Sequence, residues 1–325
     1  MDFRLSEDQE ALQGAVRAFC ERRAALDAVG DRAKAPLDRG LWSELAELGV
    51  FALREPEARG GVGLGMAEAV LVFAELGRRL VPGPLAWSHL AAPLLPGAGS
   101  GERVVGGLDL VRAASDPLLV EYFDGLDALL VLRADGVFRL DPRALAARPI
   151  GTPLDPLTPV HHVERLPAGE RLAGPEAAAR LRAEGAALAA ALQLGVAEAT
   201  LELACDWAKR REQFGRPIGS FQALKHLMAD MLVRKEEARC AVWAAGATLD
   251  DPSVGDAARA VAVAKAVAGG AALKNARACI QVHGGMGYTW EMPPHYFLKR
   301  AFVLENVFGP ADEHCEALAE RLVRP

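Results

Sequence analysis

Two long helical patterns are separated by the stretch Arg211-Glu212-Gln213-Phe214-Gly215-Arg216-Pro217-Ile218-Gly219-Ser220-Phe221-Gln222. Apolar residues recur with helical spacing over 175–211 and 221–249, and the glycines and proline of this stretch break the pattern. The break brings a guanidinium, from Arg211, and an aromatic ring, from Phe214, to one turn. Arginine suits the geometry of phosphate oxygens, and a phenyl face suits a purine. An arginine at a helix end is also a common cap, so this stretch alone leaves both interpretations open.

A second break lies at Gln281-Val282-His283-Gly284-Gly285-Met286-Gly287-Tyr288, where three glycines end a helical pattern over 254–282. Glycines let backbone N–H groups approach a ligand with no Cβ in the way. A glycine-rich helix end is often only a turn, and His283 either touches a ligand or fills that turn. Together, the two breaks predict a site able to hold a nucleotide diphosphate.

The rest of the chain predicts a mostly α-helical protein with a small central β-domain. Residues 1–100 are expected to be helical, 101–174 to form a reduced β-domain, and 175–325 to form a helix bundle. A capping box of Ser6 and Gln9 starts the first helix, and prolines within 82–96 are expected to end the first helical region. Further helices are expected near 41–48, 66–80, 175–211, 221–249, 254–282, 296–307 and 311–323, and strands near 104–105, 118–120, 128–132 and 137–140.

The composition excludes several classes of protein. Lys and Arg total 37 against 43 Asp and Glu, so a net charge of −6 lacks the basic surface of a nucleic-acid-binding protein. The apolar stretch between Glu184 and Glu198 has 13 residues, fewer than the ~20 that a membrane span needs. The five cysteines are widely spread with no C-x-x-C pair, which excludes a disulfide scaffold and a cysteine-based metal site and fits the cytoplasm. His161 and His162 are expected in a surface loop, so we expect no metal.

With both glycine-containing strings at these places, the chain resembles the acyl-CoA dehydrogenase family over essentially its full length. The resemblance implies the order of helical domain, β-domain and helix bundle, and an FAD-dependent oxidation of an acyl-CoA thioester to 2-enoyl-CoA. In that reaction a carboxylate removes the α-proton and the β-hydrogen leaves as hydride to the flavin. By the resemblance, the residues that contact the pyrophosphate and adenosine of FAD are Arg211, Phe214, Gln222, Gln281, Gly284 and Gly285. In the family, such residues serve a flavin seated mainly in the neighbouring subunit.

The sequence departs from the family at the catalytic base. Alignment of Gly309 with the glycine that follows the family's usual glutamate puts Phe308 at the base position, and a phenyl ring cannot accept a proton. Some relatives carry the base in the first long helix of the bundle, at the position of Gly185. Glu184 is one residue away, which on a helix is a rotation of about 100°. Glu184 is therefore a weak candidate base, and a solvated helix-face residue is the simpler interpretation.

The β-domain also lacks the family's strings that line the flavin ring and part of the acyl pocket. The chain thus resembles the base-lacking subunit of heteromeric acyl-CoA dehydrogenases that shorten bulky, steroid-type side chains. This resemblance implies a related catalytic subunit as partner in an α2β2 heterotetramer. It also implies an acyl-CoA substrate and an electron acceptor such as electron-transfer flavoprotein.

Two other functions remain open from the sequence. A self-sufficient homo-oligomeric acyl-CoA dehydrogenase would need a displaced base, for which Glu184 and Glu305 are the candidates. A flavin-free helical scaffold would need no cofactor contacts. The retention of Arg211 and of the Gly284-Gly285 helix break argues against a pure scaffold.

Overall fold

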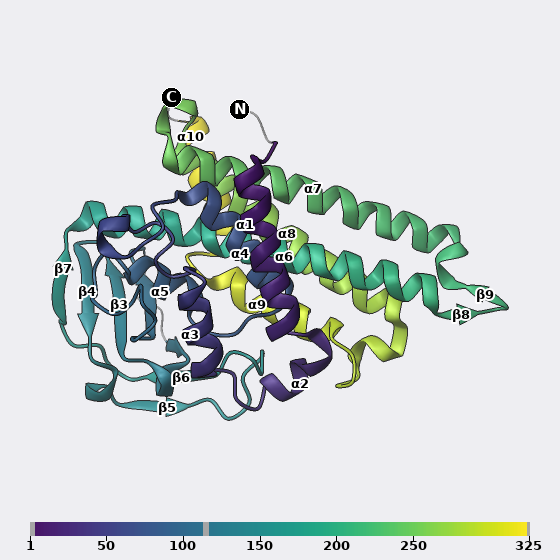
Figure 1. Cartoon of the computed structure of the whole chain (residues 1–325), viewed down its shortest axis with the longest axis horizontal. Coiled ribbons are helices and arrows are strands. Elements are labelled where there is room, and N and C mark those ends of the chain that lie inside the picture. Colours follow the sequence, from purple (N-terminus) through teal and green to yellow (C-terminus); the bar gives the residue numbers. More distant parts are fainter. Residues whose placement is uncertain (1–3, 113–116, 324–325) are drawn as a thin grey trace.

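Three parts follow one another along the chain in the computed structural model, which describes residues 4–112 and 117–323 (Figure 1). Helices come first, short strands second, and a long helix bundle last. The strands lie at one end of the molecule, and the bundle extends from them to a small hairpin at the opposite end (Figure 1). The expected fold class, mostly α-helical with a small β-domain, is confirmed.

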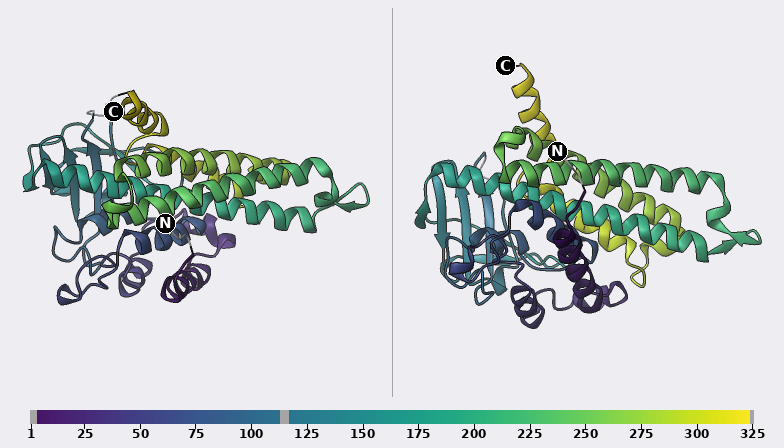
Figure 2. Two further views of the ribbon diagram at one scale, coloured as in Figure 1. Left: turned by 90° about the horizontal axis from the view of Figure 1, so that it is seen from above. Right: turned by 45° about the horizontal axis from the view of Figure 1, so that its top comes forward.

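The N-terminal helices lie along one side of the bundle (Figure 2). They are α1 (Glu7–Arg23), α2 (Val29–Arg32), α3 (Arg39–Glu47), α4 (Met66–Arg78) and α5 (Leu85–Ala91). The capping box at Ser6 and Gln9 is confirmed, because each side chain bonds the other's backbone N–H. The first helical region does end among the prolines of 82–96, but the sequence did not predict α5, which forms between them. Pro84 directly precedes α5, where a missing N–H costs little because the first N–H groups of a helix have no partner within it.

The strands form two small sheets. They are β1 (Val105–Leu110), β2 (Leu118–Glu121), β3 (Ala128–Arg133), β4 (Gly136–Leu140), β5 (Ala147–Pro149), β6 (Val160–Val163) and β7 (Glu170–Ala173). One sheet has the order β1-β3-β4-β7, with β1 and β3 parallel, and the other is antiparallel with the order β2-β6-β5. The surface loop expected at His161 and His162 is instead strand β6, in which His161 is buried and the next side chain points to the opposite face.

The bundle contains α6 (Pro175–Arg210), α7 (Gln222–Asp250), α8 (Ala257–His283), α9 (Pro294–Asn306) and α10 (Ala311–Val323). Helix α6 packs against strands β3 and β4 near its start and then runs to the far end, where α7 turns back (Figure 1). Long runs of alanine let α6 and α8 pack closely, and most alanines of α6 between 186 and 199 are buried. The helix positions expected for the bundle agree with these bounds to within a few residues.

Helix α6 is also long and apolar enough to cross a membrane by length and composition alone. Within the protein, 72% of its most apolar 18-residue window is buried against other elements. The apolar surface of α6 is therefore largely buried in the core of the protein.

Candidate functional site

The stretch that separates α6 from α7 forms an exposed hairpin at the far end of the bundle (Figure 1). Strands β8 (Glu212–Gln213) and β9 (Arg216–Pro217) pair across a tight turn. At its tip, the side chain of Phe214 is 91% exposed, and its backbone has a φ of +55°. Such an exposed ring in a left-handed conformation is unusual for a non-glycine residue, and it is available to a ligand or to another chain.

Arg211 and Gln222 flank this hairpin at two helix ends. The backbone N–H of Arg211 donates to Trp207 O at 2.8 Å, and its carbonyl accepts from the N–H of Ile218 at 2.8 Å. The Arg211 backbone is thereby fixed, while its exposed guanidinium makes no hydrogen bond or ion pair with the described residues. Gln222 is the first residue of α7 and is exposed.

The second glycine-rich string ends α8 and continues as the short 3-10 helix Gly284–Tyr288. Gly284 has a φ of +62°, which favours glycine. A Cβ placed on Gly284 or Gly285 would meet no described atom within 4 Å. The backbone is open on this side, and exposed Gln281 lies one turn before it. A ligand can therefore approach the peptide groups closely here.

A small apolar cluster brings the two strings to one end of the bundle. The rings of Trp207 and His283 stack with centroids 4.9 Å apart. His283 is buried, and its Nδ1 bonds Cys279 O at 2.8 Å, so this residue fills the turn. Ala204, Ala208, Met231, Ala278, Cys279 and Val282 are buried together around this contact. The structure thus places Arg211, Phe214, Gln222, Gln281, Gly284 and Gly285 at one exposed end.

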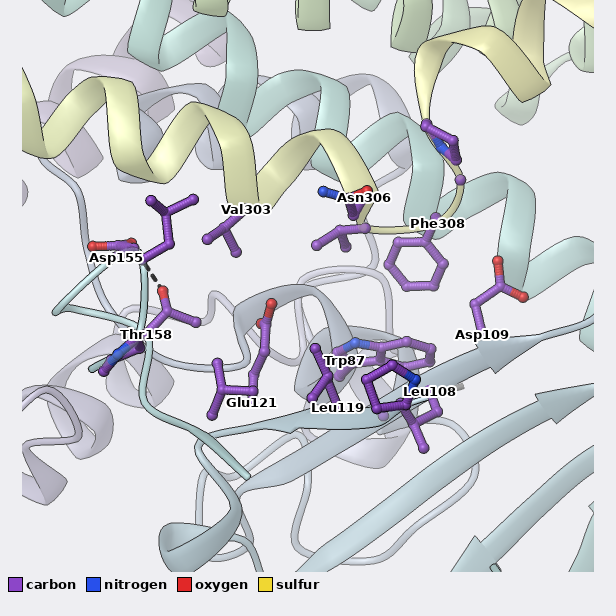
Figure 3. A pocket seen from close by; sticks show the side chains of 18 of the residues that line it. Trp87, Leu108, Asp109, Leu119, Glu121, Asp155, Thr158, Val303, Asn306 and Phe308 are labelled. Atoms are coloured by element: carbon purple, nitrogen blue, oxygen red, sulfur yellow. Dashed lines mark hydrogen bonds between the residues drawn. The ribbon is translucent and has the colours of Figure 1, made fainter. Parts of the chain in front are cut away.

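A cavity of about 580 Å³ lies at the other end, between the strands and the turn that joins α9 to α10 (Figure 3). Its walls are largely apolar and come from distant parts of the chain, including Trp87 of α5, Leu119 of β2, Val303 of α9 and Phe308 of the turn. A cavity of this size is within the usual range for small-molecule sites, roughly 300–1,000 Å³.

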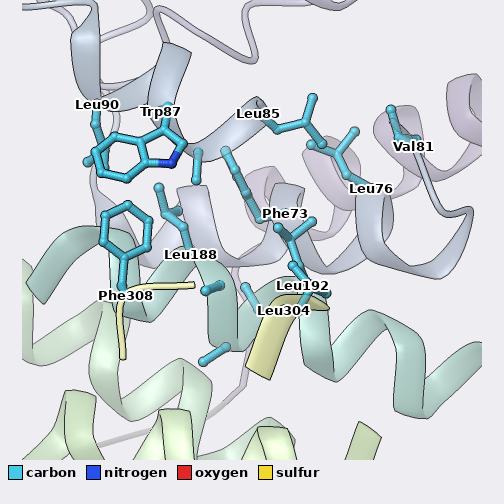
Figure 4. Close-up of a cluster of buried hydrophobic side chains, with 14 of the residues drawn as sticks. Phe73, Leu76, Val81, Leu85, Trp87, Leu90, Leu188, Leu192, Leu304 and Phe308 are labelled. Carbon is cyan, nitrogen blue, oxygen red and sulfur yellow. The ribbon is translucent and has the colours of Figure 1, made fainter. Parts of the chain in front are cut away.

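Phe308, at the expected base position, is locked into the wall of this cavity (Figure 4). Its side chain is 1% exposed, and its ring centroid lies 4.5 Å from that of Trp87. A Cβ on Gly185 would come within 2.4 Å of the Phe308 ring. The two positions at which the resemblance placed a base therefore pack against each other, and here neither provides a carboxylate.

The carboxylates of Glu184 and Glu305 point elsewhere. Glu184 forms two hydrogen bonds with the guanidinium of Arg54, at 2.9 and 2.8 Å, beside a separate cavity of about 290 Å³. Glu305 accepts from the backbone N–H of Ala311 at 2.8 Å and from Gln193 Nε2 at 3.2 Å. Neither residue lines the cavity that contains Phe308.

Of the described carboxyl groups that line the large cavity, Glu121 is the one without a partner, and the sequence did not indicate it. Glu121 ends β2, and its side chain points into the cavity between Leu119 and Thr158 (Figure 3). It makes no side-chain hydrogen bond or ion pair with any described residue. Burial raises the pKa of Glu121 to about 7, since it disfavours the charged form more than nearby Arg300 favours it.

Further charged residues line the cavity beside Phe308, and they are paired with one another. Arg182 of α6 donates to Asp109 of β1 at 2.6 Å and also bonds Glu313 of α10. Arg112 lies 3.3 Å from the same Glu313 carboxylate. These ion pairs connect three elements beside the turn that carries Phe308.

The comparisons with known proteins cover the whole chain. The acyl-CoA dehydrogenase N-terminal domain family matches residues 6–102, and the C-terminal domain family matches residues 174–323. The acyl-CoA dehydrogenase IpdE2 of Mycolicibacterium smegmatis is 34% identical over 320 residues, which are 97% of this chain and 98% of that protein. The chain belongs to the acyl-CoA dehydrogenase family.

Two solved structures share this architecture. The ChsE4-ChsE5 complex from Mycobacterium tuberculosis has a chain with a TM-score of 0.82 and 25% identity, with 100% of both chains covered. A Tcur3481-Tcur3483 steroid ACAD variant has a TM-score of 0.80 and 25% identity, with 98% of both chains covered.

Members of the acyl-CoA dehydrogenase family depend on FAD. The far end of the bundle fits the ADP part of this cofactor, because it has an unpaired guanidinium, an exposed ring and two glycines open to close approach. The large cavity offers a different environment, with the unpaired carboxyl group of Glu121 and several paired charges in its walls. The two sites therefore differ in chemistry as well as in place.

The missed residues left only weak signals in the sequence. Leu119 and Glu121 are two residues apart on β2, so their side chains lie on the same face of the strand, the face that lines the cavity. This shared face can be recognised only once the bounds of the strand are known. Trp87 lies in the unexpected helix α5. In the sequence, Gly185 stands out only because a glycine occupies a position where a base was considered. Its contact with Phe308 depends on tertiary packing, so the sequence could not predict it.

Proposed function

We propose that this chain is the base-lacking subunit of a heteromeric, FAD-dependent acyl-CoA dehydrogenase. The observation that carries the proposal is the contact between Phe308 and Gly185, which fills both positions where relatives carry a base. A related partner subunit would supply the glutamate and the flavin-ring contacts. The complex would oxidise an acyl-CoA thioester to 2-enoyl-CoA.

In this proposal the far end of the bundle holds the ADP part of the partner's FAD. Arg211 would offer fixed donors to the pyrophosphate, and the peptide groups at Gly284 and Gly285 would approach it closely. Phe214, Gln222 and Gln281 would contact the adenosine side. Bound FAD would supply the hydride acceptor for the reaction. The open space at the two glycines and the free guanidinium support this assignment.

The substrate and assembly are inferred from the relatives. The ChsE4-ChsE5 structure is a complex of two different chains, and the Tcur3481-Tcur3483 structure is described as a steroid ACAD. We infer an α2β2 heterotetramer that acts on a bulky, steroid-type acyl-CoA and passes electrons to an acceptor such as electron-transfer flavoprotein. The free cysteines of the described chain support a location in the reducing cytoplasm.

The proposal is tested by co-expression with the partner subunit, followed by native mass and measurement of FAD per tetramer. Replacement of Arg211 by Ala removes a hydrogen bond to a charged group, typically ~1.5–3 kcal/mol, so FAD should bind roughly 10- to 150-fold more weakly. The tetramer should still assemble. Arg210→Ala is the matched control, because Arg210 precedes the motif and its Nε bonds Asp206 O within α6.

Phe308→Glu adds a carboxylate to this chain and should create no second active site, because the flavin-ring contacts are still absent. Turnover per tetramer should stay at the wild-type value. Unchanged FAD affinity in Arg211→Ala would contradict the ADP assignment. A chain that is yellow and active without any partner would contradict the proposal as a whole.

A further inference from the structure

A second cavity, of about 290 Å³, lies between the loop after α3, helix α5 and the start of α6. It is separate from the cavity that contains Phe308, because none of the described residues lines both. We propose that the second cavity binds a short linear carboxylate that carries a hydroxyl group at the opposite end of its chain. The inference goes beyond the proposed function, because no residue to which that function assigns a role lines this cavity.

Helix α6 presents different faces to the two cavities. Gly185 faces the Phe308 ring, whereas Glu184, one residue earlier and about 100° around the helix, lines the second cavity. Glu184 is buried and accepts two hydrogen bonds from Arg54, so its charge is matched within the wall. A volume just below the usual range for small-molecule sites indicates a short ligand, whose hydrocarbon chain would bury apolar area in the cavity. The apolar part of the wall comes from Phe51, Leu90, Ala92, Pro93 and Leu181.

The wall also contains a buried histidine with one unsatisfied nitrogen. His89 is 3% exposed, and its Nδ1 lies 2.9 Å from Val50 O. Because a carbonyl oxygen only accepts, Nδ1 carries the proton and Nε2 is a bare acceptor. Burial lowers the pKa of His89 to about 4, so the ring is neutral at pH 7 and Nε2 has no proton to donate. Nε2 has no hydrogen-bond partner among the described residues, and a ligand hydroxyl group that donates to it would satisfy a buried polar atom.

The charged residues of this cavity leave one positive charge unmatched. Arg54, Arg180, Glu55 and Glu184 line it, and Glu55 also pairs with Arg59, whose Nε is 3.2 Å from the Glu55 carboxylate. These three guanidiniums face two carboxylates. Arg180 carries the excess charge, because the Glu184 oxygen 3.9 Å from its Nε is already bonded to Arg54. A ligand with a single carboxylate would balance this charge.

The two polar contacts lie at different depths. The Arg180 side chain is 68% exposed and stands on the solvent side of the cavity, whereas His89 is buried. A ligand that reaches both must therefore carry its two polar groups at opposite ends. The carboxylate stays near water beside Arg180, the hydroxyl group enters first toward His89, and the hydrocarbon chain between them contacts the apolar wall.

The experiment measures binding of matched probes to the full chain by NMR titration at pH 7. The compound 6-hydroxyhexanoate has both polar groups, hexanoate lacks the hydroxyl group, and 1,6-hexanediol lacks the carboxylate; 4-hydroxybutyrate and butyrate repeat the comparison at a shorter length. We expect one hydroxy acid per chain, bound roughly 5-fold more tightly than the plain acid, as one hydrogen bond predicts. In protein labelled with ¹⁵N-histidine, the Nε2 signal of His89 should shift with the hydroxy acid and stay in place with the plain acid.

Two variants assign the two polar contacts. His89→Phe keeps a ring against Phe73 and removes the acceptor, so the hydroxy acid and the plain acid should bind equally. Arg180→Gln changes a largely exposed residue, which protects the fold, and it should weaken binding of both acids while leaving the diol unchanged. Arg165→Gln is the matched control, because Arg165 is exposed and does not line the cavity, and it should bind every probe as the wild type does.

Several outcomes would overturn the proposal. These are the absence of saturable binding of either hydroxy acid, equal binding of hydroxylated and plain acids at both lengths, and a hydroxyl preference that survives in His89→Phe. Tighter binding of 6-amino-1-hexanol than of 6-hydroxyhexanoate would also overturn it, because the cavity would then select a cation. None of these readouts depends on FAD or on turnover, so failure of this proposal leaves the proposed function unaffected.

Discussion

At the scale of single residues, the contact between Gly185 and Phe308 makes the first prediction. A glycine inside a helix usually gains about 0.5–1 kcal/mol when replaced by alanine. At position 185 the new methyl group would meet the Phe308 ring within 2.4 Å, so Gly185→Ala should instead destabilise the protein by roughly 1–3 kcal/mol. Urea unfolding measures the change.

Two further variants make this prediction specific. Gly270→Ala in α8 is the control, because a Cβ there meets nothing within 4 Å, and it should be neutral or stabilising. Combining Gly185→Ala with Phe308→Leu should recover part of the loss, since the smaller side chain makes room. A strictly additive double mutant would show that the two positions do not contact each other as described.

The raised pKa of Glu121 makes a second prediction at this scale. The folded state holds the Glu121 proton up to about pH 7, whereas the unfolded chain releases it near 4.5. Below pH 4.5 Glu121 is protonated in both the folded and the unfolded state, and its contribution to the free energy of unfolding is fully present. As the pH rises to 7, the unfolded chain releases this proton, and the contribution is lost. Glu121→Gln should gain stability relative to wild type across this window, by at most roughly 3 kcal/mol. If the difference in unfolding free energy between the two proteins is the same at every pH, the burial of this carboxyl group is contradicted.

At the scale of elements, the turn between α9 and α10 is held from both sides. Lys265 donates to the backbone oxygens of Leu304 and Glu305 at the end of α9, at 3.1 and 2.9 Å. The Glu305 side chain accepts from the N–H of Ala311, the first residue of α10, at 2.8 Å. These contacts position Phe308 even though its backbone has a left-handed φ of +56°.

Removal of the Glu305 carboxylate should therefore loosen the start of α10. A side chain that satisfies the first N–H groups of a helix typically contributes ~1 kcal/mol, so Glu305→Ala should speed exchange of the amide hydrogens at 311–314 roughly 5-fold. Glu305→Gln retains an acceptor and should show a smaller effect. Hydrogen exchange followed by mass spectrometry distinguishes the three proteins, and identical rates would mean that α10 is held by its packing alone.

The elements also show what could be predicted from the sequence. The long helices were predicted correctly because apolar residues with helical spacing identify a face that must be buried. Strand β6 was missed because two histidines stand where apolar residues usually mark a strand, and α5 was missed because prolines surround it. The two glycine-containing strings could be found because each lies within one stretch of chain. The cavity could not, because Trp87, Glu121 and Phe308 meet only after folding.

At the scale of the whole molecule, the two sites should act independently. The residues of the far end and those of the cavity lie at opposite ends of the bundle, joined by the full length of α6 (Figure 1). Glu121→Met should therefore leave the FAD content of the heteromer unchanged. A loss of flavin in Glu121→Met would instead show communication along the bundle.

The position of the hairpin at the end of the bundle has a consequence for assembly. If one subunit holds the ADP part of FAD and another holds the flavin ring, the cofactor bridges two chains. FAD must then tighten the association of the subunits by the same factor by which association tightens FAD. Dilution of the complex should release cofactor and subunits together, and added FAD should hold them together at lower protein concentration. The cofactor would in this way act as a structural link that makes the quaternary state of the enzyme sensitive to the supply of flavin.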